Sequence, residues 1–246
     1  MRHVLTLALD TSSPSGSLAV LRDEQLIGSV STATGEIYSS RMFRHLEFLL
    51  SELSIELRDF DLFAVAAGPG SFTGLRVGLA AAKGWSEVYR KPIAAVSALE
   101  AIAAQSHSRS GDIVPVLDAH RGQFYFGLYR RAAATNGSSE LTLEGDECVM
   151  SPQEFLDTLT ARGVDNFVIA TPTPALISGI ASRNETMEGA RGANRVEEVS
   201  AILAPQIGRL GYHRAQRGEL VDSLALDANY VRRSDAELHW KAPKEI

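Results

Sequence analysis

A glycine-rich turn, residues 68–74, holds the residue types and spacing most suggestive of chemistry in this chain. It reads Gly68-Pro69-Gly70-Ser71-Phe72-Thr73-Gly74, between an apolar run and a helical pattern. Three glycines in seven residues indicate a sharp bend or the close approach of another backbone. A strand, a tight turn and a helix N-terminus in this order can also bind an anion, and Ser71 and Thr73 are N-cap residue types. We interpret the segment as a structural turn, with an anion-binding loop as the alternative.

The spacing excludes three common motifs at this turn. A Walker loop places Gly-Lys-Ser/Thr after four residues, but the fifth position after Gly68 is Thr73. In a dinucleotide fingerprint the third glycine follows the second by three residues, whereas Gly74 follows Gly70 by four. A nucleophile elbow needs one residue between its first glycine and its serine, and here Ser71 directly follows Gly70.

Two aspartates at the ends of apolar runs are the next candidates. Asp10 is followed by Thr11 and Ser12, and Asp118 ends a comparable run in the second half of the chain. Hydroxyls and amides beside a carboxylate can hold phosphates and a hydrated Mg²⁺. Aspartate at a strand end is also a routine turn residue. We favour the structural use of these residues and keep a vestigial nucleotide loop as the alternative.

Metal chemistry is not indicated. Zinc sites of the helical type use two histidines four residues apart, whereas no two of the six histidines here lie within twelve residues of one another. The single cysteine, Cys148, excludes an internal disulfide. The sequence therefore predicts no metal site and no cofactor, and leaves weak nucleotide binding open.

The composition predicts a globular protein. The chain has 246 residues, of which 45% are hydrophobic and 22% charged. Its net charge of −6 argues against unaided binding to a phosphate backbone. The apolar run at residues 4–9 is too short for a signal peptide or a membrane span. We therefore expect a cytoplasmic protein that makes no membrane contact.

Hydrophobic periodicity predicts alternating strands and helices. We expect strands at residues 4–9, 17–21, 25–30, 62–67, 93–96, 113–117, 123–129, 141–143, 167–170 and 228–231. We expect helices at residues 39–53, 74–89, 98–105, 152–161 and 199–217. The helix at 152–161 is preceded by a capping box that begins at Ser151.

The order of these elements repeats after a polar segment at residues 106–112. In each half a three-stranded meander is followed by a helix, then by a strand, and then by a loop that contains Gly or Pro. Residues 61–70 of the first half correspond to residues 165–174 of the second. This pattern predicts a duplicated α/β unit, with two similar lobes that each contain a mixed sheet flanked by helices. We expect an N-terminal lobe at residues 1–106, a C-terminal lobe at 107–237 and a flexible tail at 238–246.

Two predicted helices carry an unusual surface. Gly74, Gly78 and Ala82 recur every four residues, so one face of their helix is nearly bare backbone. Helix 39–53 carries more apolar residues than one core face requires, although core packing accounts for part of them. Small-residue stripes allow close helix approach, and Met and aromatic residues are enriched at interfaces. The predicted partner interface comprises Arg41, Met42, His45, Leu46, Leu49, Gly74, Val77, Gly78, Ala81, Ala82 and Trp85.

The duplicated strand-Asp-turn-strand order resembles the actin-like ATPase and sugar-kinase superfamily, which has a ribonuclease H-like topology. Within it the sequence resembles the TsaB (YeaZ) family. The matching segments are residues 7–12, 68–78, 96–99, 117–125 and 230–233. The chain departs from that family at Tyr38-Ser39-Ser40, where the family often has His-Ser-Glu, and at residues 171–174, where prolines replace glycines.

The resemblance implies a non-catalytic subunit needed for threonylcarbamoylation of the adenosine next to the anticodon in tRNAs that read ANN codons. It implies binding to a TsaD-like catalytic paralogue and a TsaE-like ATPase, formation of homodimers, and contact with tRNA only through the complex. No intrinsic activity is expected. Two alternatives stay open: an ATP-binding actin-like phosphotransferase or ATPase that uses Asp10 and Asp118, and, as a weaker reading, a peptidase.

Overall fold

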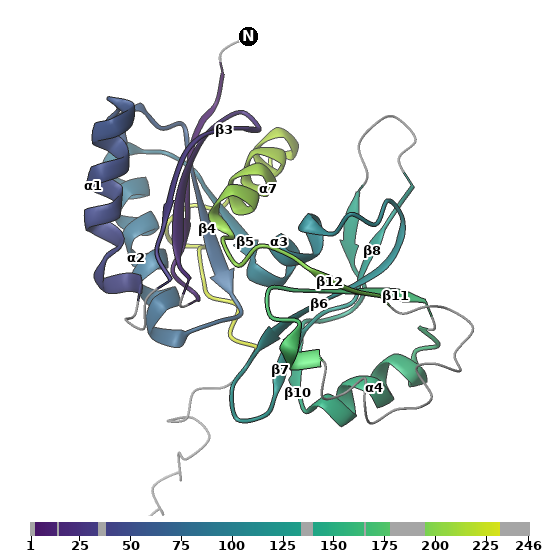
Figure 1. Cartoon of the computed structure of the whole chain (residues 1–246). Coiled ribbons are helices and arrows are strands. Elements are labelled where there is room, and N and C mark those ends of the chain that lie inside the picture. The colour runs from purple at the N-terminus through teal and green to yellow at the C-terminus, as the bar shows by residue number, and fades with distance from the viewer. Residues whose placement is uncertain are drawn as a thin grey trace, which may run out of the picture.

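The computed structural model describes residues 3–13, 15–33, 38–133, 140–164, 166–177 and 195–231. The predicted tail at 238–246 and the last residues of the matching segment 230–233 lie outside these ranges. Two sheets form the centres of two lobes, and helices cover their faces (Figure 1). The structure is thus the mixed α/β fold with two lobes that the sequence predicted.

The first sheet has the strand order β3-β2-β1-β4-β5. Strands β1 (Leu5–Asp10), β2 (Ser17–Arg22) and β3 (Gln25–Ser31) form the predicted antiparallel meander. Strands β4 (Leu62–Gly68) and β5 (Ile93–Ser97) extend the sheet in parallel with β1. Both follow helical connections, as parallel neighbours require.

Alternating side chains divide the first sheet into two core faces. Leu7 and Leu9 of β1 pack towards α1 (Met42–Leu53) and α2 (Phe72–Tyr89). Ala8 between them packs on the opposite face with residues of α3 (Ala98–Gln105) and α7 (Ala204–Arg217). This period of two is the expected geometry of a strand buried on both faces.

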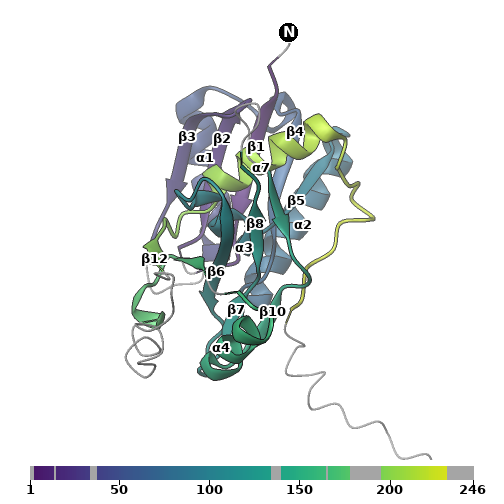
Figure 2. The same cartoon turned by 90° about the vertical axis from the view of Figure 1, so that its right-hand side faces the viewer.

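Helix α7 lies against the first sheet, although it follows the second sheet in the chain (Figure 2). A Cβ atom added at Gly211 would lie 2.7 Å from the Cβ of Ala64, so the helix backbone sits almost directly on β4. The sequence correctly predicted a helix in this region but assigned it to residues 107–237 of the second lobe. The lobe boundaries themselves stay predictions.

The second sheet repeats the first. Strands β6 (Gly111–Asp118), β7 (Phe124–Phe126), β10 (Cys148–Met150), β11 (Phe167–Thr171) and β12 (Arg195–Glu198) have the order β10-β7-β6-β11-β12. Counted among these five strands of the seven-stranded sheet, and leaving out β8 and β9, the order is again third, second, first, fourth and fifth. Helix α4 (Pro152–Ala161) packs through Phe155 against Phe124 and Phe126.

Three strand predictions in the second half were wrong in detail. The third meander strand is β10, because the predicted strand β9 (Leu141–Leu143) pairs with β8 (Tyr129–Arg131) instead. The expected strand at 123–129 is divided, since β7 pairs with the end of β6 and β8 with its beginning. Residues 228–231 form no strand. Among the described residues, no helix combines the length and the apolar character needed to span a bilayer.

Candidate functional site

The glycine-rich turn lies between β4 and α2 and packs against the loop that joins β1 to β2. The Ser71 backbone N–H donates to the Ser12 carbonyl oxygen at 2.7 Å. A Cβ atom at Gly70 would lie 2.6 Å from that same oxygen. On the other side of the turn, Gly68 adopts φ of +116° and lies against the backbone of Asn229. The glycines therefore permit close approach of backbones within the chain itself.

The hydroxyl groups of Ser71 and Thr11 cap the first turn of α2 and hold it in place. The Ser71 Oγ accepts a hydrogen bond from the Gly74 N–H at 3.3 Å, so Ser71 rather than Thr73 is the N-cap. The Thr11 hydroxyl donates to the Gly74 carbonyl oxygen at 2.6 Å. A Cβ atom at Gly74 would overlap the Thr11 carbonyl oxygen, and one at Gly78 would overlap the Thr11 hydroxyl.

This packing corrects the predicted direction of the small-residue stripe. Gly74, Gly78 and Ala82 are buried, and the two glycines face Thr11 of the same chain rather than a second protein. Close approach was correctly anticipated from the four-residue spacing, but the partner is the chain's own β1–β2 loop. The stripe is therefore part of the fold and not of an exposed surface.

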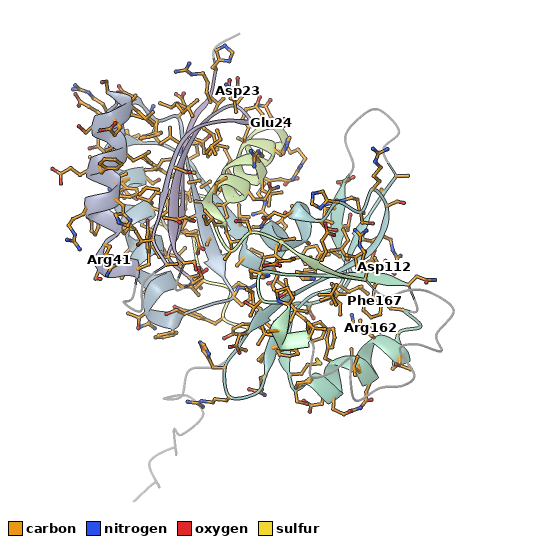
Figure 3. All side chains as sticks on the ribbon, in the orientation of Figure 1. Asp23, Glu24, Arg41, Asp112, Arg162 and Phe167 are labelled. Carbon is orange, nitrogen blue, oxygen red and sulfur yellow. The ribbon has the colours of Figure 1, made fainter. Side chains whose placement is uncertain are left out.

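Three of the five predicted contacts at α1 are also internal. Met42, Leu46 and Leu49 are buried in the core between α1, α2 and the first sheet. Arg41 and His45, and Val77, Ala81 and Trp85 on α2, are half-buried. Figure 3 labels Arg41 at the start of α1, on the side of the molecule away from the second sheet. These five residues are the predicted contacts that solvent can still reach.

The outward apolar face consists of other residues. Phe43 and Phe48 on α1 are 58% and 57% exposed, and Val88 on α2 is 72% exposed. Also on α2, Ala80 and Gly84 are exposed, and a Cβ atom at Gly84 would meet none of the described residues within 4 Å. We call these five exposed residues of α1 and α2 the outward face, although Phe43 and Phe48, five positions apart, lie about 140° apart around α1. The surplus of apolar residues in helix 39–53 was its sequence signal, whereas Ala80, Gly84 and Val88 were missed.

Asp10 is fully buried at the end of β1. Its Oδ1 accepts hydrogen bonds from the Ser12 N–H at 2.8 Å and the Ser12 hydroxyl at 2.5 Å, and its Oδ2 accepts one from the Ser13 hydroxyl at 3.2 Å. Burial raises the pKa of Asp10, and the hydrogen bonds from Ser12 and Ser13 partly offset that rise. In the β1–β2 loop, which resembles a phosphate loop in sequence, the hydroxyls of Ser12 and Ser13 are thus hydrogen-bonded to Asp10 of the same loop.

Asp118 occupies the equivalent position at the end of β6. Its Oδ1 accepts a hydrogen bond from the backbone N–H of His120 at 2.7 Å, as Asp10 accepts one from the residue two positions on. Unlike Asp10, its side chain is exposed, and the backbone of His120 and Arg121 adopts positive φ. The duplication therefore reproduces the aspartate turn in both lobes, but only the first copy is enclosed.

Tyr38 covers the β1–β2 loop. It is buried, its ring lies against Gly16, and its hydroxyl is 3.1 Å from Nδ1 of His45. Burial and the nearby Asp10 raise the pKa of Tyr38, so its hydroxyl stays protonated. The tyrosine thus anchors the start of α1 to the loop.

Phe72 lies at an exposed edge of the glycine-rich turn. Its ring centroid is 5.1 Å from that of Tyr230, and the Arg76 guanidinium lies 3.8 Å from the Phe72 ring centroid. The Arg76 Nε also donates to the Tyr230 hydroxyl at 3.2 Å. Sequence reasoning did not anticipate this cluster, because Tyr230 is far from the turn in the chain. It joins the end of the described chain to α2.

The described part of the chain contains no group of three or more His, Cys, Asp and Glu side chains that could hold a metal ion. The candidate site thus consists of two features: the enclosed polar β1–β2 loop and the exposed apolar residues of α1 and α2.

A family model described as TsaD, tRNA N6-adenosine threonylcarbamoyltransferase, matches residues 26–183. The tRNA threonylcarbamoyladenosine biosynthesis protein TsaB of Bacillus subtilis is 29% identical over 236 residues, covering 95% of this chain and 96% of that protein. The protein of the same description from Escherichia coli is 28% identical over 51% of this chain and 54% of its own length. The solved structure of YeaZ from Pseudomonas aeruginosa superposes with a TM-score of 0.72 at 25% identity, covering 92% of this chain and 99% of that one.

Two glycines of α2 provide a matched pair of tests. Gly74→Ala should destabilise the chain by about 1–3 kcal/mol, because the Thr11 carbonyl oxygen is backbone and cannot rotate away. Gly84→Ala should stabilise it by up to about 1 kcal/mol, because Gly84 is helical and has open space. Urea unfolding of both variants measures the difference. Equal effects would contradict the inward packing of Gly74.

Proposed function

Because the chain belongs to the TsaD family of tRNA N6-adenosine threonylcarbamoyltransferase proteins, and within it to the TsaB (YeaZ) group, we propose that it is an accessory subunit in threonylcarbamoyladenosine synthesis. The modified base would be the adenosine next to the anticodon in tRNAs that read ANN codons. The chain would bind and support a TsaD-like catalytic paralogue in the cytoplasm and help to recruit a TsaE-like ATPase. It would contact tRNA only through this complex.

The observation that carries the accessory role is the outward face of α1 and α2. Phe43, Phe48 and Val88 are each more than half exposed on neighbouring helices. Large apolar side chains left in water on neighbouring helices can mark an interaction site. A second protein that packed against α1 and α2 would remove these side chains from water.

The proposed contact differs from the one expected from the sequence. The outward face supplies its centre, and the half-buried residues Arg41, His45, Val77, Ala81 and Trp85 supply its border. Gly84 leaves room on α2 for a side chain of the partner, since no described residue of this chain lies within 4 Å of a Cβ at that position. The partner would be the TsaD-like paralogue, and a second copy of this chain could occupy the same face.

The enclosed β1–β2 loop supports the absence of intrinsic catalysis in this proposal. A phosphate needs free N–H and hydroxyl donors. Here the Ser12 and Ser13 hydroxyls donate to Asp10, and the Thr11 hydroxyl donates to Gly74. The glycine-rich turn covers the loop on one side and Tyr38 covers it on another. A nucleotide would have to displace these contacts before it could bind.

Substitution of Phe48 tests the proposed contact. Phe48→Glu should weaken binding to the paralogue at least about tenfold, because it places a charge in an apolar contact. It should change the free energy of unfolding by no more than about 0.5 kcal/mol, because the residue is exposed. Leu143→Glu on β9 is the matched control, since Leu143 is an exposed apolar residue of the second lobe. Calorimetric titration of both variants with the paralogue gives the affinities, and native affinity of Phe48→Glu would refute this contact.

Deletion of the gene tests the pathway directly. Nucleoside analysis of bulk tRNA should show loss of threonylcarbamoyladenosine, and expression of the intact chain should restore it. Expression of Phe48→Glu should restore much less than expression of Leu143→Glu. Unchanged threonylcarbamoyladenosine in the deletion strain would refute the proposed function.

The second candidate is an ATP-using enzyme, and the equivalent positions of Asp10 and Asp118 at the ends of β1 and β6 favour it. If the accessory role is right, calorimetry with Mg-ATP should show no saturable binding to the isolated chain. Micromolar binding that is lost in Asp10→Ala would instead support the enzyme.

The Asp10→Asn variant separates the two candidates in a second way. Burial raises the pKa of Asp10, so ionised Asp10 costs the native state stability above its unfolded pKa of 3.8. The amide removes this cost and can still accept from Ser12, so the variant should match or exceed the wild-type stability at pH 7. The gain should shrink as the pH falls towards 3.8. In cells the variant should retain tRNA modification, which an enzyme that positions Mg²⁺ with Asp10 would lose.

A further inference from the structure

Helix α3 is the direct connection between the two sheets, since it joins β5 to β6 and contacts α7, β6 and β11 (Figure 1). The chain passes between the lobes a second time after β12, where it returns to the first sheet as α7. We call α3 and its flanking residues 97 and 106–108 the α3 junction. Side chains from the second lobe hold this junction at both ends.

At the N-terminal end the holding group is the carboxylate of Glu147, which immediately precedes β10. It accepts hydrogen bonds from the Ser97 hydroxyl, from the Tyr129 hydroxyl at 2.6 Å and from the Asn229 Nδ2 at 2.5 Å. Ser97 is the N-cap of α3, and Asn229 in turn donates its backbone N–H to the Ala67 carbonyl oxygen. One carboxylate therefore joins β8 of the second lobe to the corner between β5 and α3.

At the C-terminal end the holding group is the guanidinium of Arg131 on β8. Its Nη1 donates to the carbonyl oxygens of Ser106 and Ser108 at 2.6 Å each, and its Nη2 donates to those of Ala103 and Ala104 at 3.1 and 3.2 Å. The last carbonyl groups of a helix lack partners within the helix, and a planar guanidinium can satisfy several at once. A residue of the second lobe thereby caps the connecting helix.

Glu197 on β12 holds the same segment from another direction. Its carboxylate is buried and accepts hydrogen bonds from the Ser106 hydroxyl and the His107 N–H, both at 2.8 Å, and from the His107 ring. Burial acts to raise the pKa of Glu197, but the hydrogen bonds from His107 and Ser106 outweigh it and lower the pKa to about 2. The group is therefore ionised at neutral pH, and these bonds are charge-assisted.

The two passages of the chain between the lobes are also bonded to each other. The Ser200 N–H donates to Gln105 Oε1 at 3.1 Å, and Gln105 Nε2 donates to the Ser200 carbonyl oxygen at 3.2 Å. Along the helices, Arg214 of α7 pairs with Glu100 of α3 at 2.5 Å. Both covalent links between the lobes are thus held in one hydrogen-bonded unit.

From this arrangement we infer that the α3 junction is a lock that makes the two lobes move as one body. A hinge needs a few residues whose backbone can change φ and ψ freely. Here ionised side chains of the second lobe bind the backbone from Ala103 to Ser108. The lock goes beyond the proposed function, since it depends only on contacts within this chain. It would present the outward face and the second lobe to separate partners at a constant angle.

Distance measurements between the lobes test the lock. Spin labels at Glu52→Cys on α1 and Asp157→Cys on α4, in the Cys148→Ser background, report the separation by double electron–electron resonance. Both label sites are exposed. We expect one narrow distance distribution that Mg-ATP does not alter. A broad or bimodal distribution in this parent protein would overturn the inference without any further variant.

Substitution of two residues of the lock provides a second test by the same distance measurement. Arg131→Gln and Glu147→Gln together should broaden the distribution about twofold or more, because both ends of α3 lose charged partners. Arg130→Gln is the matched control: Arg130 is the exposed neighbour on β8 and pairs with Asp112 and Glu144 at the surface (Asp112 is labelled in Figure 3). Glu147→Gln alone is the milder variant if the double variant does not fold. A native distribution in the folded Glu147→Gln or double variant would also overturn the lock, whatever the outcome of the tRNA experiment.

Discussion

The contact between Thr11 and the first turns of α2 is the constraint on which the rest of the first lobe depends. The Thr11 hydroxyl binds the Gly74 carbonyl oxygen, and its carbonyl oxygen occupies the space that a Gly74 side chain would need. Only glycine permits this approach, so the glycine-rich turn can bring α2 across the end of β1. That placement encloses the Asp10 loop and at the same time determines which side of α2 faces solvent.

The same constraint connects the polar loop to the exposed surface. Because the Gly74 and Gly78 side of α2 is turned inward, its opposite side, with Gly84 and Val88, is turned outward. Tyr38 anchors the start of α1 to the covered loop, and α1 then carries Phe43 and Phe48 exposed to solvent. The packing around a buried aspartate thus also determines which side chains of α1 and α2 remain exposed.

The two lobes share one strand order, but the burial of the aspartate turn and the helices that pack on each sheet differ between them. The aspartate turn persists at Asp10 and Asp118, yet only the first copy is buried. Helix α7 crosses back onto the first sheet, where Gly211 lies against Ala64 and Ala94 and Gly208 leaves room for the side chain of Leu21. The second lobe instead contributes Arg131, Glu147 and Glu197 to the α3 junction. The lobes are alike in topology and unequal in role.

The sequence by itself determined the order of the elements in the first half of the chain, the duplication and the capping box at Ser151, and it limited the N-cap of α2 to Ser71 or Thr73, because these features depend on neighbouring residues. It did not predict β10 or β12, because each is defined by its pairing with a strand distant in the chain, β7 or β11, rather than by a local pattern. It correctly grouped Gly74, Gly78 and Ala82 on one face of a helix, because helical periodicity determines which residues share a face. Only the tertiary structure decided that this face meets Thr11 of the same chain, since the direction of a face depends on what packs against it.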